Sequence, residues 1–188
     1  MTVRYKPLPD DALKICQVVN APPRLIAHLT LVHDVACKLV TYIQNAFPDI
    51  ELDKGSVFFG AATHDMGKAV CPEELTGPGK SHEMQGADLM KKLGVSAQRA
   101  RFAFSHGNWD GNPAIKIEDL LVALADNCWK GKRVSELETK VVDVIARTTG
   151  NDHWQVFAVL DDILQKLAAD ADHRLAWQAQ FPAVSEDC

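Results

Sequence analysis

The sequence predicts an all-α protein built as a single-domain helical bundle. Apolar residues recur at helical spacing along most of the chain, short Gly/Pro breaks separate the periodic segments, and no two segments alternate as paired strands would. The 188 residues suffice for one domain with a substantial core. No repeat, low-complexity run or interdomain linker divides the chain, so we expect one domain over residues 1–188.

Three helices are expected in the N-terminal part. The first covers about Asp10–Val19 and ends at an Asn-Ala-Pro-Pro segment. The second runs over about Pro23–Phe47, with proline in the first turn, where helices accept it. The third, near Asp53–Thr63, is rich in small and apolar residues, which predicts burial on more than one side.

A surface loop and five further helices are expected to follow. The loop covers Cys71–Lys80, which contains two prolines and two glycines. Helices at about 135–180 should pack on the core or on a second subunit, which leaves a homodimer open. The expected helices are His82–Leu93, Ser96–Ser105, Ile117–Trp129, Ser135–Thr148 and His153–Gln178.

Composition narrows the class of protein. Hydrophobic residues make up 47%, charged residues 24%, and the formal net charge is −5. No dense Lys/Arg stripe offsets that charge, so a nucleic-acid partner is disfavoured. The five scattered cysteines, without a CxxC pair, are typical of reduced thiols in a cytosolic protein. Neither a signal core nor a run of about 18 apolar residues occurs, so we expect a cytoplasmic chain without a membrane span.

Histidines and aspartates recur in an ordered series along the helices. Each member lies at or beside a helix end, or on an apolar helix face. Imidazoles with carboxylates form a ligand set for divalent transition metals, and a bundle can gather ligands from several helices around one interior point. The series is His28, His64-Asp65, His82, His106 and Asp126.

The first two histidines of the chain differ in their expected environment. His28 shares a helix face with Val32 and Ala36, so it points inward, either as a ligand or as a core histidine with a hydrogen-bond partner. His33 lies five residues further on, about 140° around the helix. We therefore expect His33-Asp34 to be a partly exposed pair outside any site.

His64 and Asp65 follow the buried third helix and precede Gly67. Neighbouring side chains on a regular helix point about 100° apart, so two adjacent ligands require a helix end or a bend. Asp65 could bridge two metals or orient a water molecule. Lys68 could neutralise an anionic substrate group, or could simply favour the helix C-terminus.

Candidate substrate contacts follow His106 in a turn-rich stretch. Loops of this kind often carry binding groups, and Asn108 and Trp109 are the candidates here. Trp109 could stack on a base or cover the core.

Asp126 ends an apolar helical run, where a carboxylate needs a metal or a cationic partner. Lys130, Lys132 and Arg133 follow, and they could bind phosphate or form a solvated cluster at the helix end. The solvated alternative is favoured for Lys132, which leaves Lys130 and Arg133 as the candidates for substrate binding.

Taken together, these motifs resemble the HD-domain superfamily of metal-dependent phosphohydrolases. The resemblance covers about residues 22–133. The matching motifs are His28-x3-Val32-x3-Ala36, His64-Asp65-Met66-Gly67-Lys68, His82-x3-Gly86-Ala87, His106 before Trp109-Asp110-Gly111, and Ala125-Asp126.

The resemblance implies an all-α fold and a metal centre. His28, His64, Asp65 and Asp126 would be the core ligands, and the additional pair found in binuclear members would be His82 and His106. It implies two divalent ions bridged by Asp65, with Fe, Mn, Co, Ni and Zn equally compatible. Asp65 and Lys68 would be catalytic.

The implied reaction is hydrolysis of a phosphoester or phosphoanhydride in a nucleotide or dinucleotide. The motif order is similar to that of bacterial HD hydrolases that split diadenosine tetraphosphate symmetrically. HD-GYP phosphodiesterases fit less well, because Ser105 stands where they place a further histidine. The alternative is a non-catalytic regulatory or nucleotide-binding module that keeps the fold.

Overall fold

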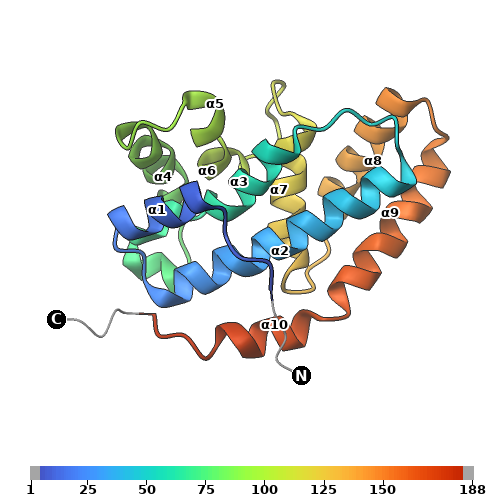
Figure 1. Ribbon diagram of the computed structural model, residues 1–188. Coiled ribbons are helices and arrows are strands. Elements are labelled where there is room, and N and C mark those ends of the chain that lie inside the picture. Colours follow the sequence, from blue (N-terminus) through green and yellow to red (C-terminus); the bar gives the residue numbers. More distant parts are fainter. Residues whose placement is uncertain (1–4, 184–188) are drawn as a thin grey trace.

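A computed structural model describes residues 5–183, and every regular element within that range is a helix (Figure 1). This confirms the predicted all-α fold. The α-helices are α1 (Asp10–Val18), α2 (Pro23–Ala46), α3 (Lys54–Thr63), α4 (Ser81–Lys92), α5 (Ala97–Ala100), α6 (Phe102–Ser105), α7 (Ile117–Cys128), α8 (Ser135–Thr149), α9 (His153–Ala168) and α10 (Ala171–Gln178). Two short 3-10 helices are η1 (Met66–Ala69) and η2 (Pro72–Leu75).

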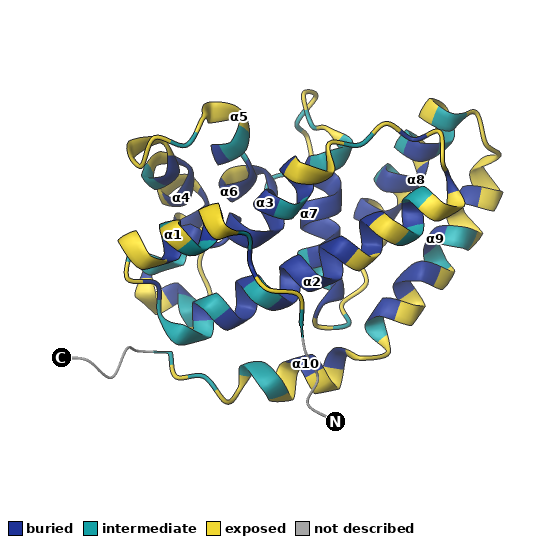
Figure 2. Cartoon of the chain, viewed as in Figure 1, coloured by how far each residue is buried: buried dark blue, intermediate teal, exposed yellow. Residues whose placement is uncertain are grey.

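Helix α2 forms the centre of the fold. It packs against α3, α7, α9 and α10, and most of the residues in its middle portion are coloured as buried in Figure 2. Among the described residues, α2 is the one helix long and apolar enough to cross a membrane, but 72% of that stretch is buried inside the protein. Core helices of soluble proteins can be equally long and apolar, and burial of this extent is typical of a central helix.

Two hydrophobic clusters meet beside the histidine–aspartate series. The larger one joins α2, α7, α8 and α9, and it includes Ala125 and Trp129. The smaller one joins α1, the start of α2 and α3, and it includes Leu25 and Met66. His28, Asp65 and Asp126 follow or adjoin these residues, so both clusters hold the backbone around them in place.

Local signals explain several helix boundaries. Asp53 accepts a hydrogen bond from the Ser56 N–H at the start of α3, and Asp152 does the same for two N–H groups at the start of α9. Gly150 ends α8 with φ 72°, a backbone conformation that favours glycine.

The predicted helix His153–Gln178 is wrong as a single element. The helix α9 ends at Ala168, and a separate helix, α10, begins at Ala171. Alanine and leucine continue through the break, so periodicity gives no sign of it. The turn allows α10 to run along α2 instead of extending into solvent (Figure 1).

Two smaller expectations also need correction. The predicted helix Ser96–Ser105 is divided at Arg101 into α5 and α6. The expected surface loop Cys71–Lys80 contains η2, and Cys71 and Glu74 within it are buried.

His33-Asp34 is buried, contrary to the expected partial exposure. The side of α2 that carries the pair is covered by the N-terminal segment, because the Lys6 N–H donates to Asp34 Oδ1 at 3.1 Å. Phe58 packs edge-to-face on the His33 ring. The pair nevertheless stays outside the histidine–aspartate site, as the helix geometry predicted.

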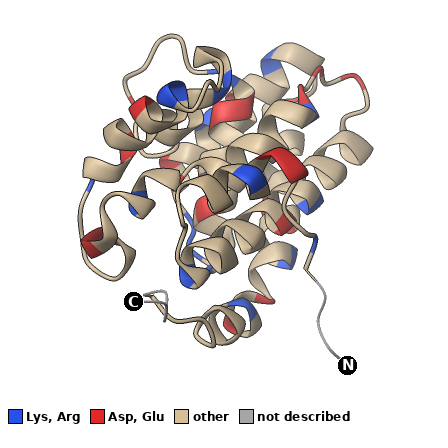
Figure 3. Cartoon of the chain, turned by 60° about the vertical axis from the view of Figure 1, so that its left-hand side comes forward, with Lys and Arg blue, Asp and Glu red and all other residues tan. Residues whose placement is uncertain are grey.

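Cys16, Cys37, Cys71 and Cys128 are free thiols, and Cys188 lies outside the described residues. Basic and acidic residues are interspersed along the described helices and loops in Figure 3, and the basic residues do not form a continuous run in that view.

Candidate metal centre

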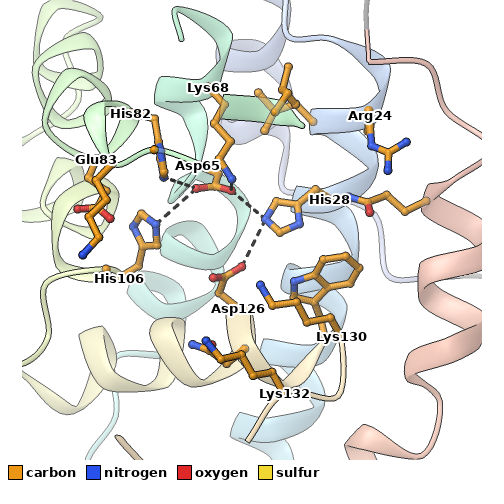
Figure 4. A pocket seen from close by; sticks show the side chains of 18 of the residues that line it. Arg24, His28, Asp65, Lys68, His82, Glu83, His106, Asp126, Lys130 and Lys132 are labelled. Atoms are coloured by element: carbon orange, nitrogen blue, oxygen red, sulfur yellow. Dashed lines mark hydrogen bonds and ion pairs between the residues drawn. The ribbon is translucent and has the colours of Figure 1, made fainter. Parts of the chain in front are cut away.

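Five segments of the chain bring the predicted ligands to one place. Figure 4 shows all of them except His64. Each ligand is at most 8% exposed apart from Asp126, which is half-buried. His28 comes from the first half of α2, His64 and Asp65 from the end of α3, His82 from the first turn of α4, His106 from the end of α6, and Asp126 from the last turn of α7.

Asp65 is the centre of the cluster. Its Oδ1 lies 3.1 Å from His82 Nε2 and 3.4 Å from His106 Nε2. Its Oδ2 lies 3.0 Å from His28 Nε2 and 2.6 Å from Lys68 Nζ. Each oxygen of one carboxylate therefore faces a different set of histidines.

Asp126 lies on the same side of the cluster as Asp65 Oδ2. The Oδ1 atom of Asp126 lies 3.3 Å from His64 Nε2 and 3.4 Å from His28 Nε2. The two Nε2 atoms are 3.3 Å apart. Two groups with metal-ligand geometry result, one containing His28, His64 and Asp65 and the other containing Asp65, His82 and His106.

A helix end and a close helix contact create this arrangement. α3 stops at Thr63, and Asp65 leaves helical geometry with φ −97° and ψ 13° before η1 begins. A Cβ on Gly67 would lie 2.0 Å from the His82 carbonyl oxygen. Gly67 therefore allows η1 to approach α4 closely enough for Asp65 to meet His82.

Outer hydrogen bonds fix the orientation of two imidazoles. His64 Nδ1 lies 3.0 Å from the Ala61 carbonyl oxygen, and His106 Nδ1 lies 3.1 Å from that of Phe102. A carbonyl can only accept, so Nδ1–H is the donor in both rings and the Nε2 lone pair points into the cluster.

Glu74 orients the His82 ring in the same way. His82 Nδ1 donates to Glu74 Oε2 at 2.5 Å, and the N–H groups of Ser81 and His82 also donate to this carboxylate. The hydrogen bond from the His82 side chain holds the pKa of Glu74 at about 2. Glu74 is thus an anion that turns His82 Nε2 toward Asp65.

These lone pairs face carboxylate oxygens, and that arrangement fits a bound cation. An Nε2 lone pair and a carboxylate oxygen repel each other at 3.3–3.4 Å unless a cation or a proton lies between them. Nitrogen donors of histidine combined with carboxylate oxygens suit divalent transition metals. The residues present therefore fit the ions that the sequence predicts.

The charge states of the ligands are mutually dependent. Burial would raise the pKa of Asp65, but the histidines that surround this carboxylate, His64 foremost, hold it well below the ordinary value. Burial would lower the pKa of His28, yet hydrogen bonds to Asp126 and Asp65 raise it. The pKa of His64 is lowered because burial outweighs its carboxylate neighbours.

The cluster opens into a cavity of about 550 Å³. Cations dominate its charged lining, which also includes Asp65, Glu83 and Asp126. Arg24, Lys80, Lys130 and Lys132 form no ion pair within residues 5–183, and Lys68 pairs only with Asp65. Basic groups therefore gather at this cavity although the chain is acidic as a whole.

Two tryptophans line the same cavity. Trp129 packs edge-to-face on His28, with ring centroids 5.1 Å apart. Trp109 is half-buried against the larger hydrophobic cluster and also faces the cavity. Trp109 thus covers the core and remains available to a ligand, so both of the alternatives for this residue are compatible with its position.

Two predicted substrate contacts do not line the cavity. Asn108 Nδ2 donates to Glu83 and to the Phe104 carbonyl, so its amide is already used within the fold. Arg133 forms ion pairs with Glu138 and Asp161, on the side of α8 and α9. Intramolecular acceptors thus hold both side chains outside the cavity lining, and a contact of either with a substrate stays a prediction.

The cavity also includes residues that the sequence did not single out as contacts. Lys132 is exposed, as expected for a solvated side chain, and it also lines the cavity with Lys130. The Lys130-Gly131-Lys132 sequence, with one lysine on each side of a glycine, was the signal that could have indicated that both lysines reach the cavity. No pattern in the sequence indicated Arg24, Lys80, Glu83 or Gln178, which reach the cavity through tertiary packing.

The fold and site define an all-α protein with two buried histidine–aspartate groups that share one carboxylate. The HD domain family model matches residues 25–129, more than half of the chain, and the chain belongs to this family. Members of the family are generally metal-dependent phosphohydrolases. All six candidate ligands lie within the matched range. No curated protein and no solved structure matches the chain.

Proposed function

We propose that the protein is a metal-dependent phosphohydrolase that cleaves a phosphoester or phosphoanhydride bond of a nucleotide or dinucleotide. The observation that carries the proposal is the convergence of histidine Nε2 atoms and carboxylate oxygens on both sides of Asp65. Membership of the HD domain family supports the reaction class.

The proposal includes two divalent ions held by the two groups that share Asp65. His28, His64 and Asp126 would hold the ion on the Oδ2 side, and His82 and His106 the ion on the Oδ1 side. When bound, such ions activate water and stabilise charge on phosphoryl oxygens. Fe, Mn, Co, Ni and Zn all suit this ligand set.

The protein's own groups bind and orient the substrate. Lys68 Nζ lies 2.6 Å from Asp65 Oδ2 and lines the cavity, so it can neutralise a phosphoryl oxygen beside the ligands. Lys130 and Lys132 extend the positive charge away from the cluster. A substrate with several phosphate groups would use more of these cations than a simple monoester.

This charge distribution supports a finer assignment within the proposal. We take dinucleoside polyphosphates, the substrates of the bacterial hydrolases that the motif order resembles, as the first substrates to test. Mononucleotides and cyclic nucleotides complete the panel, because family membership does not select among them.

A phosphate-release screen tests the proposal. We expect release from at least one compound in this panel when Mn²⁺, Fe²⁺, Co²⁺ or Ni²⁺ is supplied, and none after chelation. Asp65→Ala should abolish release because it removes a ligand from both groups, while circular dichroism and the melting curve show a folded chain. Asp88→Ala is the matched control, since this exposed aspartate of α4 contacts only Lys91 among the described ion pairs. Full activity of the Asp65→Ala variant on the best substrate would refute the proposal.

A further inference from the structure

Helix α10 lies outside the matched residues 25–129 but reaches the cavity. It packs on α2 (Figure 1), and Gln178 in its last turn lines the cavity together with Arg24 and Leu25 from α2. The residues matched by the family model therefore include the metal ligands but not the part of the cavity lining that α10 provides.

Arg174 ties α10 to the end of α7. Its side chain is 1% exposed, and its Nε donates to the Trp129 carbonyl oxygen at 2.5 Å. Its Nη2 donates to the carbonyls of Cys128 and Leu167 at 3.3 and 2.6 Å. Carbonyls at helix ends lack partners within the helix, so one guanidinium satisfies the ends of both α7 and α9.

The segment fixed by Arg174 carries two cavity cations. Lys130 follows Trp129 directly, and Lys130 and Lys132 flank Gly131, whose φ is 75°. A Cβ on Gly131 would lie 3.0 Å from Ala171 Cβ, so this turn lies directly against the start of α10. The position of both lysines thus depends on how α10 is seated.

Gln178 lies one helical turn after Arg174 and is half-buried at the cavity. Its amide forms no side-chain hydrogen bond within residues 5–183. An amide offers two donors and one acceptor without charge. It therefore suits the uncharged polar groups of a ligand, whereas the lysines suit its phosphates.

We propose that α10 forms a specificity wall, in which Gln178 contacts the base or sugar of a nucleotide and Arg174 positions Lys130 and Lys132 for its phosphates. The proposal rests on the proposed function in that it assigns the nucleotide to the same cavity. Gln178 is the contacting residue, and Arg174 is a positioning residue that acts through the lysines.

A calorimetric titration of the metal-loaded protein with two probes tests the contact made by Gln178. The probes are adenosine 5′-(β,γ-imido)triphosphate, which carries a base and sugar, and imidodiphosphate, which carries neither. Gln178→Ala should weaken the nucleotide probe about three- to tenfold, as expected for loss of a neutral hydrogen bond, and change imidodiphosphate less than about twofold. The matched control is Gln180→Ala, an exposed glutamine just beyond α10 that does not line the cavity, and it should change neither affinity.

The same titrations test Arg174. Arg174→Leu should weaken both probes with metal content unchanged, and Arg174→Lys should recover part of the loss. If the leucine variant does not fold, the lysine variant is compared with the wild type directly, and it should bind imidodiphosphate more weakly. Unchanged imidodiphosphate affinity in a folded Arg174 variant would refute the positioning role.

Two results would overturn the contact made by Gln178: equal effects of Gln178→Ala on the two probes, or no effect on either. A wild-type protein that does not bind the nucleotide probe would overturn it as well. Failure of the proposed function is a separate result. If the wild type binds the nucleotide probe, and Gln178→Ala weakens that binding, but the protein releases no phosphate, the specificity wall is supported and the hydrolase function is refuted. Conversely, if Gln178→Ala leaves phosphate release unchanged, only the hydrolase function is supported.

Discussion

At the scale of single residues, protons and metal ions compete for the same nitrogen atoms. Hydrogen bonds to Asp126 and Asp65 outweigh burial and raise the pKa of His28 above its ordinary 6.5. The pKa of His82 is raised as well, because its bonds to Asp65 and Glu74 outweigh burial. In the metal-free protein, both rings hold a proton at pH values where an ordinary histidine is neutral.

This competition predicts how metal affinity depends on pH. A bound ion needs the Nε2 lone pair, so it must displace these protons. Mn²⁺ affinity should therefore fall as the pH decreases, and the fall should begin above pH 6.5 because both pKa values are raised. Calorimetry in two buffers of different ionisation enthalpy should detect proton release on binding. Affinity that is constant between about pH 8 and about pH 6 would contradict the ligand assignment.

Glu74 provides a second prediction at this scale. Glu74→Gln replaces an anionic acceptor with an amide that can present either its oxygen or its NH₂ group to His82. Loss of an outer partner of this kind costs about 10- to 100-fold in metal affinity, so one of two binding steps should weaken while the other persists. The neighbouring Glu73→Gln is the matched control, because Glu73 is exposed. If both variants bind metal like the wild type, Glu74 does not orient His82.

The ligand series was predictable because each member lies at a helix end or on an inward face. The outer partners were not. Glu74 reaches His82 only through the tertiary fold, and Ala61 and Phe102 accept through backbone carbonyls, which every residue type has. His33-Asp34 shows the same limit, because the N-terminal segment that buries it is distant in sequence. Arg133 adjoins the cavity lysines in sequence, yet two acidic side chains on α8 and α9 hold it elsewhere.

At the scale of helices, the close contact between η1 and α4 determines whether the two ligand groups can share Asp65. Gly67→Ala should destabilise the protein by about 1–3 kcal/mol, because the added Cβ overlaps backbone atoms of α4 that cannot move independently. Metal binding should weaken with it, as His82 moves away from Asp65. Chemical unfolding and metal titration of the same variant measure both effects.

Gly55→Ala is the matched control for this prediction. A Cβ there would meet only Asp53 Oδ1 at 3.5 Å, an ordinary contact in the first turn of α3. Alanine at a compatible helical position is neutral or stabilising by up to about 1 kcal/mol. Equal stabilities of the two variants would show that the approach of η1 to α4 is not constrained.

Most helices could be predicted from apolar periodicity. The wrong predictions share one cause, which is that tertiary contacts determine the backbone there. α9 and α10 read as one helix because alanine and leucine continue across the turn at Ala168–Ala171. Cys71–Lys80, which contains η2, was expected to be an exposed loop because its two prolines and two glycines are typical of surface turns. In both cases tertiary hydrogen bonds from Arg174 and to Glu74 decide the backbone path.

At the scale of the whole molecule, segments distant in sequence meet at one cavity. The ligands come from the matched family region, while α10 comes from the C-terminal part, for which the sequence indicated only packing. Trp177 of α10 packs on the larger hydrophobic cluster, as predicted, whereas Leu175, the one leucine of this helix, is exposed. Its contribution of Gln178 to the cavity follows only from the way α10 lies along α2.

The central claim is that this histidine–aspartate cluster is a hydrolytic metal centre. Its most direct test is a titration of metal-free protein with Mn²⁺, in which bound metal and phosphate release from the best substrate are measured in the same samples. We expect no release without metal, release that rises with metal occupancy, and saturation at two equivalents of Mn²⁺. Equal release from the metal-free protein, or full metal occupancy without release from any substrate of the panel, would contradict it.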